Sequence, residues 1–246
     1  MKSDESGRVD RRPGEKTTDD SGSEFVANVG HDLKSYLNPI IGFVSVLMQN
    51  EREFSAEQRH QLELVLQSAK QMLNRIDALV TFLRLQAGST VCKAEWVSPR
   101  DLLAEVGSYF ETRKDELHVE HDETRIRVRV DRRLVARALG ELVANALDAS
   151  QGKEVLINAE YDSSAKRLTF SVHDRGIGLD EGHRARLREV LGRGHDQSLE
   201  GLGLGLALAR EAADACGAWL EVAGEKDGGS VFSLLLEPDP ADIEGA

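Results

Sequence analysis

The sequence predicts an α+β protein in which a two-helix hairpin is followed by an α/β sandwich domain. Apolar residues recur with helical spacing over two long stretches, from Phe25 to about Asn50 and from Ser55 to Gly88. After Val91, strand and helix patterns mix without strict alternation, which favours a sandwich over a doubly wound parallel sheet. The predicted organisation is a disordered tail or linker over 1–23, the hairpin over 24–89, the sandwich domain over 90–239 and a C-terminal tail over 240–246.

Composition and charge narrow the class of protein. The chain has 246 residues, of which 40% are hydrophobic and 30% are charged, and its formal net charge of -12 disfavours nucleic-acid binding and docking to an anionic membrane. It has no apolar run of the roughly 18 residues that a membrane span needs, and no secretory signal at its N-terminus. Cys92 and Cys216 are isolated in sequence and form neither a metal cluster nor a disulfide framework. We therefore expect a cytoplasmic protein.

The first 23 residues lack the apolar side chains of a folded segment. Only Met1 and Val9 are apolar, and the rest are rich in Ser, Gly, Asp, Lys and Arg. Such a stretch cannot bury enough surface to offset its ordering entropy. The sequence therefore predicts a disordered tail or linker that cannot form a sensor domain.

A helix from Phe25 to about Asn50 would place His31 almost directly opposite its apolar stripe. A lone histidine is more often a core or surface filler, but the face around His31 is small and polar, whereas a solvated face is normally long and charged. This face leaves room for a large group to approach the imidazole. The stripe would contain Phe25, Val29, Leu33, Tyr36, Leu37, Ile40, Val44 and Leu47, and the His31 face would contain Ala27, Ser35, Asn38, Gly42 and Ser45.

A second helix is predicted from the capping box Ser55-Ala-Glu-Gln58 to a C-terminal cap at Ala87-Gly88. Two long helices joined by a short turn form an antiparallel hairpin. The apolar stripes are too wide for the two helices to cover, so a symmetric partner hairpin would complete a four-helix bundle. The alternative is that the stripes pack on the C-terminal domain. The second stripe contains Leu62, Val65, Ala69, Met72, Leu73, Ile76, Leu79, Val80 and Leu83.

The second domain shows strand and helix signals in irregular order. Asp131 can cap a helix that extends through Ser150. A glycine-rich turn at Gly228-Gly229 separates the two closing strands. The expected strands are 96–97, 126–130, 155–161, 167–173, 219–223 and 230–236, and the expected helices are 101–110, 132–150 and 203–217.

One candidate site lies in the predicted helix that ends at Ser150. Glu141 and Asn145 are one turn apart, so both project from the same helix face. A carboxylate and a carbonyl oxygen suit a hydrated Mg²⁺ that also contacts phosphate oxygens. The alternative is an ordinary helix that precedes a loop.

Two glycine-rich runs supply further candidates. Asp174 follows a predicted strand, and Gly176 and Gly178 stand at alternate positions after it, where the backbone can bend and approach a ligand closely. A second run opens a helix, where free N–H groups and the helix dipole favour an anion. Each run alone is more often a structural turn. The glycines of the second run are Gly201, Gly203 and Gly205.

In this order, the three blocks and the His31 hairpin resemble the sensor histidine kinases of two-component signalling. The resemblance covers nearly everything from Phe25 to Leu236. The run 31–35 (His-Asp-Leu-Lys-Ser) resembles their phosphoacceptor box, and the run 79–88 resembles the end of their second dimerisation helix. The second domain is similar to an ATP-binding group that also contains gyrase, mismatch-repair and chaperone ATPases.

The resemblance implies roles for the matching residues. His31 would accept a phosphoryl group from ATP, and Asp32 would act as the base that raises its nucleophilicity. Ser35 would orient water in a phosphatase reaction. Asn145 would hold Mg²⁺, and the related ATPases use a glutamate at the position of Glu141 as a general base.

The resemblance also implies how the glycine-rich runs bind the nucleotide. Asp174 would receive the adenine amino group, and Gly176 and Gly178 would shape the adenine pocket. The three glycines of the second run, Gly201, Gly203 and Gly205, would cradle the phosphates and hinge a lid, which would be the mobile segment Leu179–Glu200.

The chain departs from the family pattern at several positions. Tyr36 stands where the family usually has proline, and Pro39, three residues later, would bend the helix there. The lid lacks the phenylalanine pair that is common in the family. Asp148 stands where a basic residue is frequent, and this would leave phosphate charge less well offset and weaken ATP binding.

The leading hypothesis is a homodimeric histidine kinase that phosphorylates His31 with ATP and passes the phosphoryl group to an aspartate of a response regulator receiver domain. The input would come from the bundle itself, from a domain outside this sequence or from a separate sensor protein. One alternative is a histidine phosphotransferase or pseudokinase that does not use ATP. A second is an ATPase of the gyrase or chaperone type that uses Glu141 to activate water.

Overall fold

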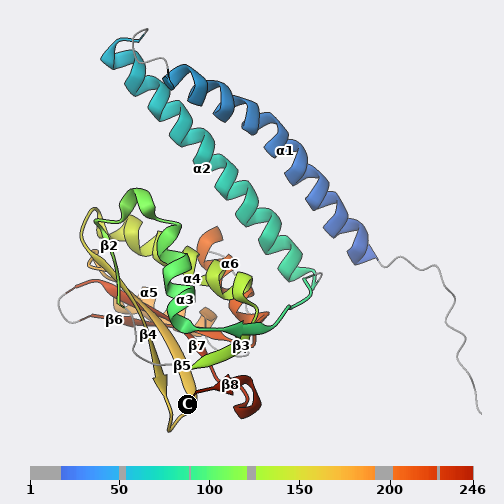
Figure 1. Ribbon diagram of the computed structural model, residues 1–246, viewed down its shortest axis with the longest axis vertical. Coiled ribbons are helices and arrows are strands. Elements are labelled where there is room, and N and C mark those ends of the chain that lie inside the picture. Colours follow the sequence, from blue (N-terminus) through green and yellow to red (C-terminus); the bar gives the residue numbers. More distant parts are fainter. Residues whose placement is uncertain are drawn as a thin grey trace, which may run out of the picture.

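The computed structural model describes residues 18–49, 54–88, 90–120, 126–191, 202–225 and 228–245, and for 18–27 it describes the backbone alone. It shows a long helical hairpin with a compact α/β domain beside the lower half of its second helix (Figure 1). The order of fold elements agrees with the predicted α+β class. None of the described helices is long and apolar enough to cross a membrane.

The hairpin consists of α1 (Thr18–Gln49) and α2 (Ala56–Gln86). Residues 18–23, which were expected to be disordered, are the first turns of α1. Extending a formed helix is far easier than nucleating one, so a polar segment can continue the helix. Residues 1–17 lie outside the described part of the chain.

The predicted caps of α2 are confirmed. The backbone N–H of Gln58 donates to Ser55 Oγ over 3.2 Å, and the backbone N–H of Ser55 donates to Gln58 Oε1 over 2.9 Å. Gly88 follows the last turn with φ +61°, a left-handed conformation that glycine adopts without strain. These two caps fix the ends of α2, and the link to the second domain begins directly after it.

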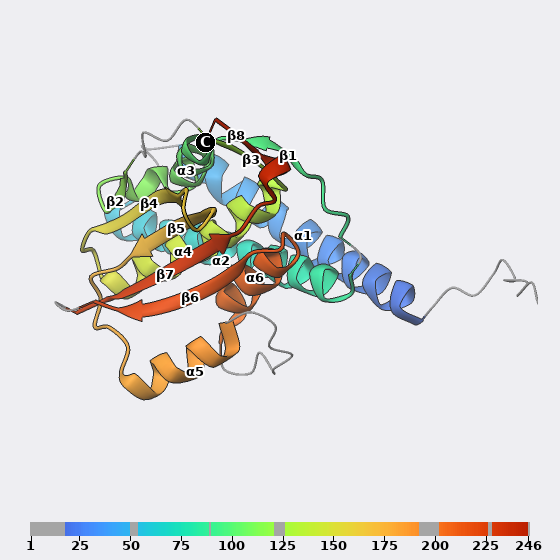
Figure 2. The ribbon, with the colours of Figure 1, turned by 90° about the horizontal axis from the view of Figure 1, so that it is seen from below.

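The main sheet of the second domain has five strands in the order β2-β4-β5-β7-β6. The outer pair β2 and β4 is parallel, and the other neighbours are antiparallel. Helices α3, α4 and α6 cover the face of this sheet that is turned toward the hairpin, and α5 lies beside β6 (Figure 2). The bounds are α3 Pro99–Ser108, η1 Glu111–Arg113, β2 Leu117–Val119, α4 Arg132–Ser150, β4 Val155–Asp162, β5 Arg167–His173, α5 Glu181–Leu191, α6 Leu204–Asp214, β6 Trp219–Gly224 and β7 Ser230–Leu236.

A smaller sheet has the order β1-β3-β8, with β1 at Glu95–Val97, β3 at Arg127–Val130 and β8 at Ile243–Glu244. The stretch 240–246 was expected to be a tail, but η2 (Pro240–Asp242) and β8 occupy most of it. Ion pairs from β3 to this segment help to hold it in place, with Arg129 3.5 Å from Asp242 and Arg127 3.7 Å from Glu244. Sequence patterning missed β2 and β8 because a strand of two or three residues shows no periodicity.

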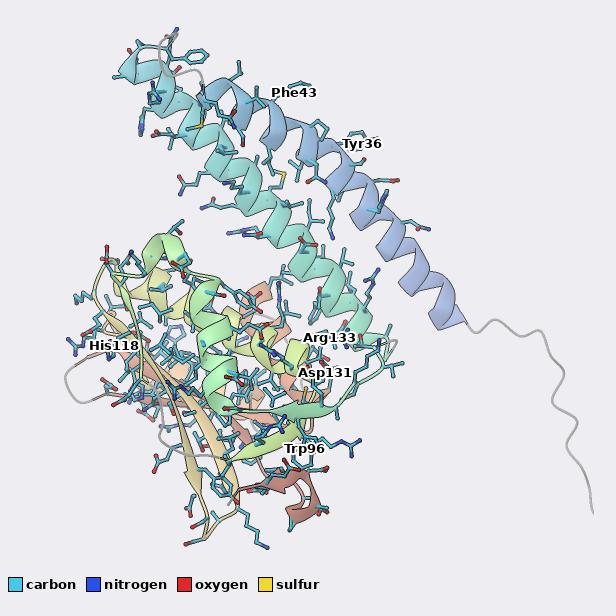
Figure 3. All side chains as sticks on the ribbon, viewed as in Figure 1. Tyr36, Phe43, Trp96, His118, Asp131 and Arg133 are labelled. Atoms are coloured by element: carbon cyan, nitrogen blue, oxygen red, sulfur yellow. The ribbon has the colours of Figure 1, made fainter. Side chains whose placement is uncertain are left out.

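The second domain packs against one face of α2. Ala78 and Leu85 are buried in the core of this domain, and Phe82 packs against the same core. None of these three residues belongs to the predicted apolar stripe of α2, so the second domain packs on another face of the helix. The face of α1 that is turned away from α2 stays exposed, as Tyr36 and Phe43 show in Figure 3.

Asp131 joins the interdomain link to the second domain. Its Oδ2 accepts a hydrogen bond from the Lys93 backbone N–H over 2.7 Å, and its Oδ1 caps α4 by accepting from the N–H groups of Arg133 and Leu134 (Figure 3). Burial alone would raise the pKa of this carboxyl, but the hydrogen bonds from Arg133, Lys93 and Leu134 outweigh burial and lower the pKa. The predicted cap at Asp131 is therefore confirmed, and it also anchors the end of the link.

Candidate functional site

A cavity of about 830 Å³ lies between α4, α6, the end of α3 and α2. A cavity of this size accommodates a ligand as large as a nucleotide. The predicted site residues Glu141, Asn145, Gly203 and Gly205 all line it. Its other lining residues are Gln71, Asn74, Arg75, Ala78, Tyr109, Phe110, Ala136, Arg137, Gly140, Ala144, Asp148, Leu202, Leu204 and Leu206.

Gly205 in the first turn of α6 lies directly against the polar face of α4. A Cβ atom at Gly205 would be 2.9 Å from Glu141 Oε2 and 3.4 Å from Asn145 Oδ1. Gly203 is the N-terminal cap of α6 with φ +76°, a backbone conformation that a side chain would strain. The N-terminus of α6 therefore faces two oxygen donors at close range. Gly201 lies outside the described residues.

Glu141 is paired with an arginine of its own helix. Arg137 Nη2 is 2.8 Å from Glu141 Oε1. Burial raises the pKa of the Glu141 carboxyl, and the charge of Arg137 opposes this shift only in part. The oxygen that faces Gly205 belongs to a partly desolvated carboxylate, which a cation in the cavity would stabilise.

The fit of Glu141 and Asn145 to Mg²⁺ can be judged from the donors themselves. Both supply the hard oxygen atoms that Mg²⁺ prefers, and Mg²⁺ usually binds one or two protein groups together with water and substrate phosphates. The described residues contain no group of three or more His, Cys, Asp or Glu that could hold a metal alone. The site thus suits a metal that arrives with a phosphate ligand.

Asp148 also lines the cavity, and its charge is offset within the domain. Arg113 in η1 lies 3.1 Å from Asp148 and 2.8 Å from Glu116. The side-chain hydrogen bond with Glu116 is the largest cause of a raised pKa of Arg113. Arg113 therefore offsets part of the charge of Asp148, and the expectation of weaker ATP binding stays a prediction.

Asp174 forms a second group of residues at the C-terminal end of α4. It is only 3% exposed, and its Oδ1 accepts from the Gly176 N–H over 2.8 Å. A Cβ atom at Gly176 would be 2.7 Å from the carbonyl oxygen of Ala149. Asp174 and Gly176 are not among the lining residues of the 830 Å³ cavity. Ala149 follows Asn145 by one helical turn, or about 6 Å along the axis, so α4 connects the two groups.

The loop around Asp174 is supported by a close approach of two backbones. Gly178 has φ +73°, and a Cβ atom there would be 3.2 Å from the backbone of Gly229. A Cβ atom at Gly229 would be 2.0 Å from the carbonyl oxygen of Asp174. The sequence indicated Gly229 only as part of a turn, and its contact with Asp174 was missed because the two residues are distant in sequence.

His31 lies on α1 with its side chain 84% exposed. Asp32 Oδ1 is 3.6 Å from His31 Nδ1, and Ser35 Oγ donates to the Asp32 carbonyl oxygen over 2.7 Å. Asn38 and Gly42 on the same face are exposed, and Ser45 is half-buried. The backbone of Gly30, next to His31, is so close to α2 that a Cβ atom there would be 2.3 Å from Val80 Cγ2.

Tyr36 and Pro39 do not interrupt α1. The helix continues through Pro39, and Tyr36 is 71% exposed. Lys34, one turn after Gly30, forms an ion pair with Asp77 of α2. The packing of α1 on α2 therefore continues on both sides of His31.

The structure places His31 and the cavity on different sides of the hairpin. The cavity opens against α2, while α1 lies on the far side of α2 from the second domain (Figure 1). Sequence reasoning missed the α2 side of the cavity, which consists of Gln71, Asn74 and Arg75. No local pattern could indicate these residues, because only the docking of the two domains brings them to the site. Tyr109 and Phe110 at the end of α3 were missed for the same reason.

The fold agrees with the comparisons with known proteins. Residues 22–88 match the His kinase A (phospho-acceptor) domain, and residues 130–240 match the histidine kinase-, DNA gyrase B- and HSP90-like ATPase family. The chain is similar in structure to full-length ShkA in complex with AMPPNP, with a TM-score of 0.68 and 24% identity over 91% of this chain and 47% of that one. It is also similar to the histidine kinase AdeS of Acinetobacter baumannii, with a TM-score of 0.56 and 20% identity over 83% of this chain and 98% of that one.

Curated relatives show the same similarity in sequence. The sensor histidine kinase AruS of Pseudomonas aeruginosa is 27% identical over 94% of this chain and 24% of its own length. The sensor histidine kinase MtrB of Mycobacterium leprae is 29% identical over 86% of this chain and 39% of its own length. The chain thus spans between a quarter and two fifths of these relatives. With a phosphoacceptor hairpin followed by an ATPase-type domain, the chain belongs to the sensor histidine kinases of two-component signalling.

Proposed function

We propose that this chain is an ATP-dependent protein kinase core that phosphorylates His31 and passes the phosphoryl group to an aspartate of a response regulator receiver domain. The observation that carries the proposal is the presence in one chain of an exposed His31–Asp32 pair and a cavity lined by Glu141, Asn145 and the N-terminus of α6. The matches to a phospho-acceptor domain and to an ATPase domain support the same activity.

The two ring nitrogens of His31 would have different roles. Asp32 Oδ1 lies 3.6 Å from Nδ1, so in the reaction its carboxylate would approach Nδ1 and stabilise the imidazolium that forms. The lone pair of Nε2 then attacks the γ-phosphorus of ATP. The N–P bond forms as the bond from phosphorus to the β–γ bridging oxygen breaks, and ADP leaves with that electron pair.

The second domain supplies the proposed nucleotide site. Glu141 and Asn145 would hold Mg²⁺, which supplies charge neutralisation to the phosphates when it is bound. The N-terminus of α6 at Gly203 and Gly205 offers N–H groups and a positive dipole to the phosphate oxygens. Asp174 would accept the amino hydrogen of adenine. Its carboxylate is already oriented by the N–H of Gly176.

Autophosphorylation requires a rearrangement from the docked arrangement. The cavity faces α2, and His31 is on α1 beyond it (Figure 1). The ATP-binding domain must therefore leave this face of α2 before the γ-phosphate can reach a His31 imidazole, either in its own chain or in a partner. The docked arrangement corresponds to a state that is not transferring phosphate.

We infer that the hairpin forms a homodimer. Leu33, Ile40 and Leu47 are exposed on α1 at heptad spacing, and Val29, Tyr36 and Phe43 form a second exposed heptad series in the same stripe. On α2, the exposed residues Val65, Met72 and Leu79 repeat every seven residues. A second hairpin would cover both stripes and form a four-helix bundle.

The test uses γ-labelled ATP with the wild type, His31→Gln and the matched control His60→Gln. His60 is also an exposed histidine of the hairpin with a carboxylate, Glu63, within 3.9 Å. We expect acid-labile, base-stable label on the wild type and the control, and none on His31→Gln. Label that survives His31→Gln contradicts the proposal.

The two alternatives give other outcomes. A pseudokinase would show no label and no heat on titration with Mg-ATP. If the chain were an ATPase of the gyrase or chaperone type, the His31→Gln variant would still hydrolyse ATP and the Glu141→Ala variant would not.

Ser35 offers a test of the proposed phosphatase activity toward the phosphorylated regulator. Its hydroxyl lies one turn after His31 and is held by the Asp32 carbonyl oxygen at 2.7 Å. If Ser35 orients the attacking water, the Ser35→Ala variant should still autophosphorylate but should no longer dephosphorylate the receiver domain. Equal receiver dephosphorylation by Ser35→Ala and the wild type contradicts this role.

The input signal would come through α1 or from a separate sensor protein.

A further inference from the structure

We propose that Arg75 of α2 binds the phosphate tail of the nucleotide while the ATP-binding domain is docked on the hairpin. The inference rests on the proposed ATP site and adds a residue from the phosphoacceptor domain to it. Arg75 lines the same cavity as Glu141, Asn145 and Gly205. The nucleotide site in this arrangement is therefore shared between the two domains.

The face of α2 changes character where it passes the cavity. Ala78, Phe82 and Leu85 toward its C-terminal end pack on the core of the ATP-binding domain. One turn earlier, the same face presents Gln71, Asn74 and Arg75 to the cavity. These positions are spaced by three and four residues and so lie on one side of the helix. The apolar part fixes the docking, and the polar part is left facing the site with hydrogen-bond donors.

The charges in the cavity explain why an arginine at this position matters. Each lining carboxylate has an arginine partner, since Glu141 pairs with Arg137 at 2.8 Å and Asp148 with Arg113 at 3.1 Å. Arg75 has no carboxylate partner within the part of the chain that the structure describes. Its guanidinium is therefore available for an anion, and its planar donors suit phosphate oxygens.

The shared site couples nucleotide binding to docking. A ligand that contacts both domains stabilises the docked arrangement by as much as docking increases its affinity. ATP would then hold the ATP-binding domain on α2 until the hairpin changes conformation. The arginine would act through the phosphates, so the coupling should be strongest for ATP, weaker for ADP and absent for adenosine.

The first experiment measures the affinities of the full chain for Mg-ATP, Mg-ADP and adenosine by calorimetry. We compare Arg75→Ala with Arg84→Ala, an exposed arginine of the same helix that does not line the cavity. We expect Arg75→Ala to weaken ATP binding about tenfold, as for loss of one charge-assisted contact, to weaken ADP binding less and to leave adenosine unchanged. The Mg-ATP affinity of Arg75→Lys should lie between those of the wild type and Arg75→Ala, because lysine keeps the charge but lacks the planar N–H donors of the guanidinium.

The outcomes separate this inference from the proposed function. If the wild type binds Mg-ATP and Arg75→Ala binds it equally well, the inference is overturned and the ATP site stands. If the wild type binds no nucleotide, both fail. If Arg75→Ala weakens adenosine as much as ATP, the residue acts on the domain structure, and the phosphate contact is overturned.

A second experiment tests whether Arg75 acts through docking. Ala78 is buried between α2 and the ATP-binding domain, so Ala78→Asp should open this interface. ATP binding should weaken in Ala78→Asp, and Arg75→Ala should have little further effect in that background. Additive effects of the two substitutions would overturn the shared site, since Arg75 would then act without docking.

Discussion

Gly30 and Val80 bring the two helices of the hairpin into close contact beside His31. A Cβ atom at Gly30 would lie 2.3 Å from Val80 Cγ2, a distance at which one side chain or helix must move. Immediately before the proposed phosphoacceptor, the two helices are thus so close that a side chain larger than that of glycine does not fit without movement.

Gly30→Ala should therefore destabilise the hairpin. Overpacking costs about 1–3 kcal/mol, which exceeds the gain of up to about 1 kcal/mol from replacing glycine by alanine in a helix. The matched control is Gly42→Ala in the same helix, where a Cβ atom meets nothing within 4 Å. Urea unfolding should show a loss of stability for Gly30→Ala and a gain for Gly42→Ala. A gain in both variants would mean that the close contact does not exist.

Gly205→Ala should impair Mg-ATP binding without unfolding the domain. The new methyl group would lie 2.9 Å from Glu141 Oε2 and would push aside the carboxylate that faces α6. Displacing a group that positions a metal typically costs about tenfold or more in affinity. The control is Gly42→Ala on α1, where a Cβ atom meets nothing within 4 Å and which does not line the cavity. Calorimetry with Mg-ATP checks both, and equal affinities for the two variants would count against the Glu141–Asn145 site.

Phe43→Glu should dissociate the proposed homodimer. Phe43 is 73% exposed and lies on the outer face of α1 with Tyr36 (Figure 3). A charge there would be buried and unpaired in a four-helix bundle. Asn38→Glu is the control, because Asn38 is exposed on the His31 face of the same helix. Sedimentation should give the 27.1 kDa monomer for Phe43→Glu and twice that mass for the control. A dimer that persists in Phe43→Glu would place the interface elsewhere.

Asp131→Asn should destabilise the ATP-binding domain in a pH-dependent way. The folded pKa of Asp131 is lowered, so its carboxylate stabilises the fold at pH values above its unfolded pKa of about 3.9. This contribution is lost as the pH falls through the lower folded pKa. We expect Asp131→Asn to cost about 1 kcal/mol at pH 7, because asparagine still caps the helix but its neutral amide replaces the charged acceptor of Arg133 and of the Lys93 N–H.

The stability difference between the wild type and Asp131→Asn should therefore narrow below pH 4. Urea unfolding from pH 7 to pH 3 measures it. Asp239→Asn provides a control, because Asp239 caps only the short η2. A difference that is constant over this pH range would show that the charge of Asp131 contributes nothing.

Much of the fold could be predicted because the helices and long strands have clear local signals. The capping box at Ser55 and Gln58 and the cap at Asp131 fix helix ends through contacts within three residues. The strand β2 has three residues and pairs with β4, in which the partner of Leu117 is Val155, 38 residues later along the chain, so no local pattern reveals it.

The segment α5 shows a second limit of sequence reasoning. It was expected to be part of a mobile lid, and residues 181–191 form a helix of which only Val190 and Leu191 are buried. Arg188 in this helix donates to the carbonyl oxygen of Val222 in β6. This helix attaches to the sheet through arginine side chains and not through an apolar stripe. Because apolar periodicity is the helix signal in a sequence, the segment gave none. Residues 192–200 of the expected lid lie outside the described part of the chain.

The candidate site was partly predictable for the same physical reason. Glu141 and Asn145 share a face because they are one helical turn apart, and this spacing is visible in sequence. Tertiary packing between distant segments brings Gly205 next to them and places Arg75 of the hairpin in the same cavity. Residues that join the site only through domain docking have no sequence signature.

The hydrogen bond from Lys93 to Asp131 limits how far the ATP-binding domain can travel. The link between α2 and this anchor runs from Ala87 to Lys93, and about six peptide units reach at most roughly 20 Å when fully extended. Gly30, the residue before His31, lies against Val80 of α2, and Val80 is about 10 Å from Ala87 along the helix axis. The level of His31 on the hairpin is thus within reach of the anchor at Lys93. The ATP-binding domain can therefore approach the histidine while the hydrogen bond between Lys93 and Asp131 stays intact.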